Sequence, residues 1–134
     1  MGKVRLTVRV DFGADHALGP GKIRLLEAIG KTGSISRAGR ALGMSYRRAW
    51  LLIDDMNRSF RAPVVATQPG GVRGGGAELT PFGREVIETY RAIETRATAA
   101  AKPHLQALTN ALRRRRVRAR PQKPRKTSIR AAAR

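Results

Sequence analysis

The sequence lacks cysteine altogether and is poor in acidic residues. Without cysteine, the chain forms no disulfide bond and offers no thiolate ligand to a metal ion, which fits a reducing compartment. It has no long apolar run, so we predict neither a signal peptide nor a membrane-spanning helix and expect a cytoplasmic protein. Only 9 acidic residues stand against 28 Lys and Arg, for a formal net charge of +19. This excess favours nucleic acid as a polyanionic partner, with an anionic membrane surface as the alternative.

The positive charge is concentrated near the C-terminus. Residues 113–134 contain 11 basic and no acidic residues, whereas residues 1–112 contain 17 basic and 9 acidic residues and keep a net charge of +8. The C-terminal segment also has almost nothing to bury. We therefore predict a folded basic domain over residues 1–112 and a disordered basic tail over residues 113–134. Flexible positive charge of this kind neutralises DNA phosphates without reading their sequence.

The spacing of the apolar residues predicts a mainly α-helical domain with a small β component. Apolar residues at every second position indicate a strand with one buried face, and apolar residues three and four apart indicate a helix. The predicted elements, in chain order, are a strand over residues 4–10, a loop over 11–21, helices over 22–31, 34–42 and 45–60, a β-hairpin over 64–79 with a glycine-rich tip at 69–76, and a long helix from residue 80.

Residues with capping roles mark the ends of the predicted helices. Ser34 and Ser45 are expected to be N-caps, because a serine hydroxyl can accept a hydrogen bond from a backbone N–H of the first turn. Gly43 can take the left-handed conformation that closes the helix between them. Thr80, followed by proline, is a strong start for the long helix. Pro103 is expected to interrupt that helix and leave a shorter final helix behind it.

This order of elements is typical of a winged helix-turn-helix, with residues 34–42 as the supporting helix, 45–60 as the recognition helix and the hairpin as the wing. In this motif the first residues of the recognition helix reach base edges in the major groove, where the arginine fork matches O6 and N7 of guanine. An arginine at the wing tip can enter the minor groove or lie on a phosphate. The predicted DNA contacts are Ser34, Ser36, Arg37, Ser45, Tyr46, Arg47, Arg48 and Arg73.

Two apolar features have other expected roles. Trp50 is predicted to pack in the core with its indole N–H on a partner, and contact with a base or phosphate is the alternative. The apolar stripe along the long helix is longer than one core needs, which favours a helix–helix interface between two copies of the chain. The predicted homodimer contacts are Val86, Tyr90, Ile93 and Ala97.

Nothing in the sequence predicts catalysis. The two histidines, His16 and His104, are far apart and have no matched neighbours. Asp54 and Asp55 are adjacent, so on a helix they point about 100° apart and form no carboxylate pair. One or the other is expected to form a surface ion pair or to keep that side of the helix away from phosphate. The glycine-rich tip lacks the patterns of nucleotide-binding loops. We therefore predict a non-enzymatic protein with no metal site and no cofactor.

Residues 32–38 and 42–50 resemble the N-terminal DNA-binding domain of the ModE family, the bacterial molybdate-responsive regulators. The glycine-rich segment and the Glu-Leu-Thr-Pro-Phe-Gly run that follows it are similar as well, and the same layout occurs in LysR-type regulators. The similarity covers roughly residues 21–93. It implies a winged helix that dimerises through elements including the long helix. Each protomer would place residues 45–48 in one major groove, and the dimer would read an inverted repeat.

The chain differs from the ModE family in its C-terminal region. ModE proteins that sense molybdate carry a C-terminal oxyanion-binding region of small β-barrels, whereas this chain ends in its basic tail, so we expect no small-molecule effector. We favour a dimeric transcriptional regulator that binds specific sites on double-stranded DNA in the cytoplasm. One alternative is a nucleoid-associated architectural protein that binds DNA with little sequence preference. Another is an interaction module whose winged helix binds protein and whose tail binds RNA or membrane.

Overall fold

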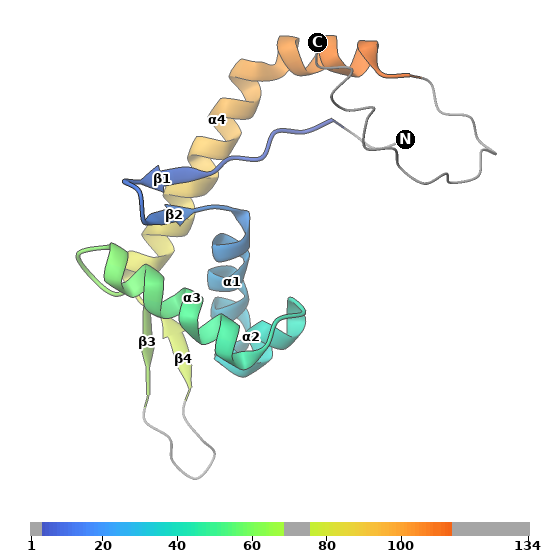
Figure 1. The fold of residues 1–134 in the computed structure, drawn as a ribbon. Coiled ribbons are helices and arrows are strands. Elements are labelled where there is room, and N and C mark those ends of the chain that lie inside the picture. Colours follow the sequence, from blue (N-terminus) through green and yellow to red (C-terminus); the bar gives the residue numbers. More distant parts are fainter. Residues whose placement is uncertain (1–3, 69–75, 114–134) are drawn as a thin grey trace, which may run out of the picture.

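A computed structural model describes residues 4–68 and 76–113 of the 134-residue chain. It is a mainly α-helical winged helix-turn-helix with two small antiparallel hairpins and a long C-terminal helix, which confirms the predicted fold class (Figure 1). The elements are β1 (Val10–Phe12), β2 (His16–Leu18), α1 (Pro20–Thr32), α2 (Ile35–Ala41), α3 (Tyr46–Ser59), β3 (Val65–Thr67), β4 (Ala77–Leu79) and α4 (Pro81–Ala111).

Helix α1 lies at the centre of the core. Four of its side chains are 0% exposed: Ile23, Leu25, Leu26 and Ile29. The helix contacts α2, α3 and α4, and also strand β2 of one hairpin and strand β4 of the other. Full burial of one such side chain contributes about 1.5–3 kcal/mol. The other three helices therefore pack around α1, and one strand of each hairpin also contacts it.

The predicted caps and turns are present. Ser34 Oγ accepts a hydrogen bond from Arg37 N at 3.0 Å, and Ser45 Oγ accepts one from Arg48 N at 3.1 Å. Gly43 has a φ of 72°, in the left-handed region. Each of these devices satisfies or redirects backbone groups that a helix end leaves without a partner.

Thr80 ties the start of α4 to the end of the α3–β3 connection. Its hydroxyl oxygen accepts a hydrogen bond from Gly83 N at 2.8 Å and its hydroxyl donates to Pro63 O at 2.7 Å. The predicted N-cap is therefore confirmed. Because the same side chain also reaches Pro63, it sets the direction in which α4 leaves the wing.

The prediction for residues 4–21 is partly wrong. Residues 4–9 form no strand, although their exposure alternates as a strand's would, and the first strand begins only at Val10. The predicted loop contains the end of β1, all of β2 and the first residues of α1. Gly13, with a φ of 72°, lies in the turn between β1 and β2, and the two strands pair Val10 with Leu18. The segment before β1 instead lies along α4, where Tyr90 Oη donates a hydrogen bond to Val8 O at 2.6 Å.

The prediction that Pro103 interrupts the long helix is also wrong. Helix α4 continues through Pro103 to Ala111 and bends in its C-terminal half instead of ending (Figure 1). Proline removes one backbone donor and its ring meets the carbonyl four residues earlier, so a bend relieves the clash. The neighbouring residues 97–101 are rich in alanine, the strongest helix former, which favours continuation.

No helix in the described ranges combines the length and the apolar character that crossing a membrane requires. The predicted disordered tail lies outside the described residues, apart from Arg113, as does Arg73 at the predicted wing tip.

Candidate nucleic-acid interface

Helices α2 and α3 cross closely through two small residues. A Cβ atom placed on Gly39 would lie 3.3 Å from Ala49 Cβ and 3.2 Å from Met44 O. On α3, Ala49, Ile53 and Met56 are at most 3% exposed and form the buried face. Since this face is held against the core, the opposite face of α3 is turned to solvent.

The first turn of α3 is exposed and basic. Tyr46, Arg47 and Arg48 are all exposed, and the turn contains no acidic residue. Ser45 caps the helix, and the partial positive charge of a helix N-terminus adds to that of the two guanidinium groups. This end of the helix is therefore suited to an anionic partner such as a phosphate, and to guanine edges.

The start of α2 lies beside this turn. Ser36 and Arg37 are exposed, and Ser34 is half-buried with its hydroxyl oxygen engaged as the N-cap. A hollow of about 310 Å³ separates α2, α3 and the root of the hairpin, and it is lined by Ser34, Ser36, Tyr46, Trp50, Thr67 and Gln68, among others. The structure thus brings Ser34 and Ser36 at the start of α2 together with Tyr46 at the start of α3 around one hollow.

The β3–β4 hairpin is the wing, and α3 holds it in place. Asn57 Nδ2 donates a hydrogen bond to Val65 O at 3.2 Å, and Asn57 Oδ1 accepts one from Val64 N at 2.7 Å. The paired residues Val65 and Leu79 are buried at the root, whereas Glu78 in the middle of β4 is exposed. Sequence reasoning missed Asn57, whose only signal is an amide side chain near the end of a helix, eight positions before the strand begins.

The prediction that Trp50 packs in the core is wrong. Its side chain is 44% exposed and lines the hollow between α3 and the wing. Trp50 follows the buried Ala49 by one position, which turns it about 100° away from the α2 crossing. The close approach of α2 and α3 leaves room for alanine at that crossing, so the indole lies at the surface instead.

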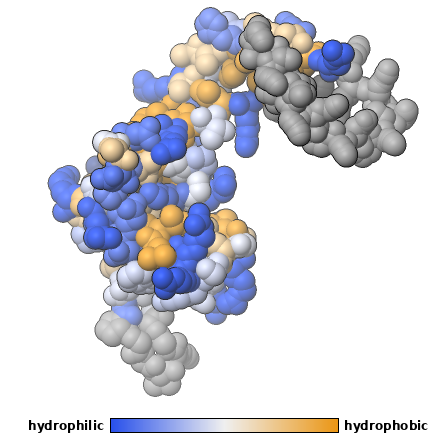
Figure 2. Space-filling view, in the orientation of Figure 1, coloured by the Kyte–Doolittle hydropathy of each residue, from blue (hydrophilic) through white to orange (hydrophobic). Residues whose placement is uncertain are grey.

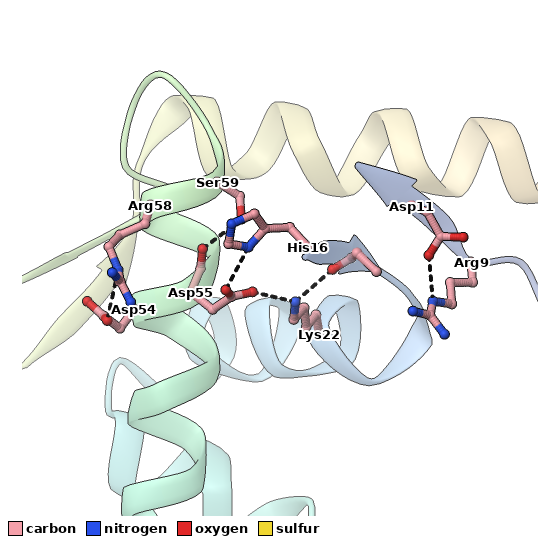
Figure 3. A network of polar contacts seen from close by, with 9 residues as sticks. Arg9, Asp11, His16, Lys22, Asp54, Asp55, Arg58 and Ser59 are labelled. Atoms are coloured by element: carbon pink, nitrogen blue, oxygen red, sulfur yellow. Dashed lines mark hydrogen bonds and ion pairs between the residues drawn. The ribbon is translucent and has the colours of Figure 1, made fainter. Parts of the chain in front are cut away.

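Ion pairs occupy the C-terminal half of α3 (Figure 3). Asp54 Oδ2 lies 3.2 Å from Arg58 Nε, one turn along the helix. Asp55 Oδ1 lies 2.9 Å from His16 Nδ1, and Asp55 Oδ2 lies 2.7 Å from Lys22 Nζ. A surface ion pair was predicted for one aspartate or the other, and the structure shows an ion pair for each of them.

The Asp55 contacts join three elements. The hydrogen bond from Lys22 lowers the pKa of the Asp55 carboxyl below its ordinary value, against the opposing effect of burial, and the His16 contact acts in the same direction as Lys22. The statement that His16 has no matched neighbour is wrong, because its partner lies 39 positions away in the chain. Among the described residues, no group of three or more His, Cys, Asp and Glu side chains could hold a metal ion.

The four predicted dimer contacts on α4 differ in their surroundings. Val86 and Tyr90 are 8% and 1% exposed within the single chain, so they belong to its own core. Ile93 is 40% exposed and Ala97 is half-buried. An apolar groove lies beside Ile93, lined chiefly by Phe12, Leu18, Phe60, Phe82, Val86 and Tyr90.

Comparison with known proteins identifies the class of the domain. Residues 21–84 match the family of bacterial regulatory helix-turn-helix proteins of the lysR type. The stretch from α1 to the beginning of α4 is therefore similar to the LysR-type regulatory helix-turn-helix, as the sequence motifs suggested.

The same part of the chain is similar to three curated relatives. It is 52% identical over 77 residues to the molybdenum-pterin-binding protein MopB of Rhodobacter capsulatus (58% of this chain, 28% of that protein). It is 44% identical over 90 residues to the molybdenum transport protein ModE of Azotobacter vinelandii (67% and 33%). It is 41% identical over 71 residues to the DNA-binding transcriptional dual regulator ModE of Escherichia coli strain K12 (53% and 27%). The chain thus spans a third or less of the length of these relatives, and the predicted resemblance to ModE is confirmed for the matched segment.

Proposed function

We propose that this chain is a DNA-binding transcriptional regulator that reads the major groove with α3 and contacts the flanking backbone with its wing. The main support for this proposal is the first turn of α3, which is exposed and basic and contains Arg47 and Arg48. The opposite face of the helix packs against α2. The LysR-type match and the name of the Escherichia coli relative support the same role.

The DNA contact that we propose for each side chain follows from its position in the domain. The guanidinium groups of Arg47 and Arg48 project from the outer face of α3 and would bind guanine edges, which their planar fork fits. Ser36 and Arg37 at the start of α2 would bind phosphates, because the supporting helix of this motif crosses the backbone. Arg73 keeps its proposed minor-groove or phosphate contact on the sequence argument alone.

We also propose that the regulator is a homodimer joined through α4. An α-helix rises about 1.5 Å per residue, so its 31 residues reach well past the core that α1 organises. Ile93 and Ala97 would contact the second copy, and the apolar groove beside Ile93 would receive its side chains. Two such protomers would read an inverted repeat with half-sites about 34–36 Å apart if these lie one helical turn apart.

The proposed role is limited to DNA binding. Two of the relatives have names that refer to molybdenum, but the chain covers only 28% and 33% of their lengths. We propose no catalytic activity and no effector for the described domain.

Selection of bound sequences from random double-stranded DNA tests the proposed function. A regulator should enrich a defined inverted repeat and bind it about 10³-fold or more tightly than random DNA at the same salt concentration. Equal affinity for all sequences would reject a sequence-specific regulator in favour of an architectural protein. Absence of DNA binding would favour a protein-interaction module.

Variants of the recognition helix sharpen the test. The double substitution Arg47→Ala and Arg48→Ala should remove most of the preference for the selected site, at about 1–3 kcal/mol for each lost base contact. The double substitution Arg96→Ala and Lys102→Ala, at two exposed positions on α4, removes the same charge, is the matched control and should keep the preference. If both variants lose the same amount of binding, the arginines act only through their charge.

A further inference from the structure

The recognition helix exposes an apolar patch that the contacts proposed above leave unused. Six large hydrophobic side chains are exposed in the described part of the chain, and three of them lie in the first two turns of α3: Tyr46 (57%), Trp50 (44%) and Leu51 (46%). Figure 2 shows an apolar area over α3, bordered by strongly hydrophilic side chains. Apolar surface held in water on a structured face is a mark of an interaction site.

Leu51 and Trp50 lie on different sides of this patch. Leu51 follows Arg47 by four positions and Arg48 by three, so the two arginines and Leu51 share the outer face of α3. That face lies opposite the buried side chains of the helix. Trp50 is turned about 100° from Leu51, toward the hollow at the root of the wing. Leu51 is therefore the apolar side chain placed among the predicted base-reading groups.

The surroundings of Leu51 favour DNA over an apolar protein surface as its partner. The guanidinium groups of Arg47 and Arg48 lie one turn before it, and the first turn of α3 has no acidic residue that would repel phosphate. The two carboxylates one turn after it, those of Asp54 and Asp55, are paired with Arg58 and with Lys22. In the major groove each base edge presents hydrogen-bonding groups, and the C5-methyl group of thymine is the apolar feature that distinguishes it from the other bases.

We propose that Leu51 reads thymine, by packing its side chain against the C5-methyl group of that base in the major groove; this inference rests on the proposed function. One helical turn rises about 5.4 Å and base pairs are spaced about 3.4 Å along each strand. The thymine therefore lies one or two base pairs from the base that Arg47 contacts. Leu51 would then add a hydrophobic element of specificity to the polar readout by the arginines.

Removal of the methyl group alone tests the contact. In the site selected by the wild-type protein, each thymine is replaced in turn by deoxyuridine, which keeps all hydrogen-bonding groups and lacks the methyl group. The wild-type protein should bind about fourfold more weakly at one symmetric position, the effect of one buried methyl-sized group. The Leu51→Ala variant should bind the thymine and deoxyuridine sites equally well at that position.

Leu108→Ala is the matched control, because Leu108 is 60% exposed and lies on α4, away from the recognition helix. It should keep the fourfold discrimination of the wild type. The proposal is overturned if the wild type tolerates deoxyuridine at every position, or if Leu51→Ala discriminates as strongly as the wild type. A change of oligomeric state in Leu51→Ala without a change in discrimination would also overturn it, in favour of a protein contact.

The outcomes separate this inference from the proposed function. If the wild type shows no preference for any selected site, the proposed function fails and the thymine contact with it. If it prefers a site but ignores the methyl group, only the role of Leu51 fails. Leu51 lies at the surface, so the variant should unfold at the wild-type temperature and remain suitable for the comparison.

Discussion

At the scale of single residues, small side chains decide how closely the elements of this domain approach. Gly83, in the first turn of α4, is buried against the segment that leads into β3. A Cβ atom there would overlap the carbonyl oxygen of Val64, which already accepts a hydrogen bond from Thr80 N at 3.0 Å. The wing and α4 can therefore meet at this point only if the side chain is a hydrogen atom.

Gly83→Ala should lower the free energy of unfolding by about 1–3 kcal/mol, because the backbone must shift to admit the methyl group. Urea unfolding followed by circular dichroism measures the change. Gly21→Ala is the control, since a Cβ at Gly21 meets nothing within 4 Å; it should stay within about 0.5 kcal/mol of the wild type. Equal stability of the two variants would contradict the close contact with Val64.

Exposure at this scale also separates the two halves of α3. The N-terminal half presents arginines and apolar groups to solvent, while the C-terminal half pairs its aspartates with cations. Negative charge is thus kept at the end of the helix away from Ser45, where it does not repel a phosphate at the N-terminus.

At the scale of elements, the Asp55 contacts fasten α3 to α1 and β2. The Lys22 side chain that bonds Asp55 also donates to Ala17 O at 2.7 Å. This lysine is 17% exposed and Asp55 is 30% exposed. The pair is therefore partly protected from the solvent screening that weakens ion pairs at the surface.

Asp55→Asn should destabilise the domain by about 1 kcal/mol at neutral pH. The pKa of Asp55 in the folded state lies below its ordinary value of 3.8, so the contribution of this carboxylate to stability is fully present above the ordinary value and is lost as the pH falls through the folded-state pKa. Urea unfolding at pH 7 and at pH 3 should show a difference between wild type and variant that shrinks at the lower pH. A difference that is equal at both pH values would contradict the charged interaction.

The two parts of α4 differ in how they contact the rest of the domain. Its N-terminal part is fastened to the core through Val86 and Tyr90, and an ion pair joins Arg91 to Glu27 of α1 at 2.9 Å. Beyond this point the helix has exposed side chains, including Leu108 at 60%. The first part of α4 therefore belongs to the protomer, and its outer part is left for other contacts.

At the scale of the whole molecule, the proposed homodimer depends on Ile93. Ile93→Asp should weaken the dimer by tenfold or more, since burying an isoleucine is worth about 1.5–3 kcal/mol and a buried carboxylate would add a desolvation cost. Sedimentation equilibrium over a range of concentrations measures the dissociation constant. Thr95→Asp adds the same charge at an exposed position on the opposite side of α4 and is expected to leave the constant unchanged. A monomeric wild type would remove the dimer from the proposed function.

The net charge of residues 1–112 supports the proposed binding of DNA. Residues 1–112 carry a net charge of +8 before the basic segment that follows them is counted. Affinity for DNA should consequently fall with salt, because each neutralised phosphate releases bound counterions. In the proposed function, charge contributes affinity at this scale, and the choice of sequence would depend on the few side chains at the start of α3.

Much of the local structure could be predicted from the sequence. Ser34, Ser45 and Thr80 cap helices where their neighbours in the chain indicate, and Gly43 makes the left-handed turn. Such features depend on backbone groups within three or four residues. The helix-turn-helix and the hairpin were predicted from such local features, and the resemblance to ModE was recognised from residues 32–38 and 42–50.

Other features were decided by contacts between distant parts of the chain. Trp50 is exposed because Ala49, one position before it, faces α2 and Trp50 is turned about 100° away, and His16 meets a carboxylate 39 positions away. Tyr90 is buried because residues 4–9 lie along α4 and do not pair as a strand. The sequence by itself therefore determined the helix caps and the helix-turn-helix with its wing, which depend on neighbouring residues. The tertiary structure decided the course of residues 4–18 and which apolar and charged side chains remain exposed, since these depend on what packs against them.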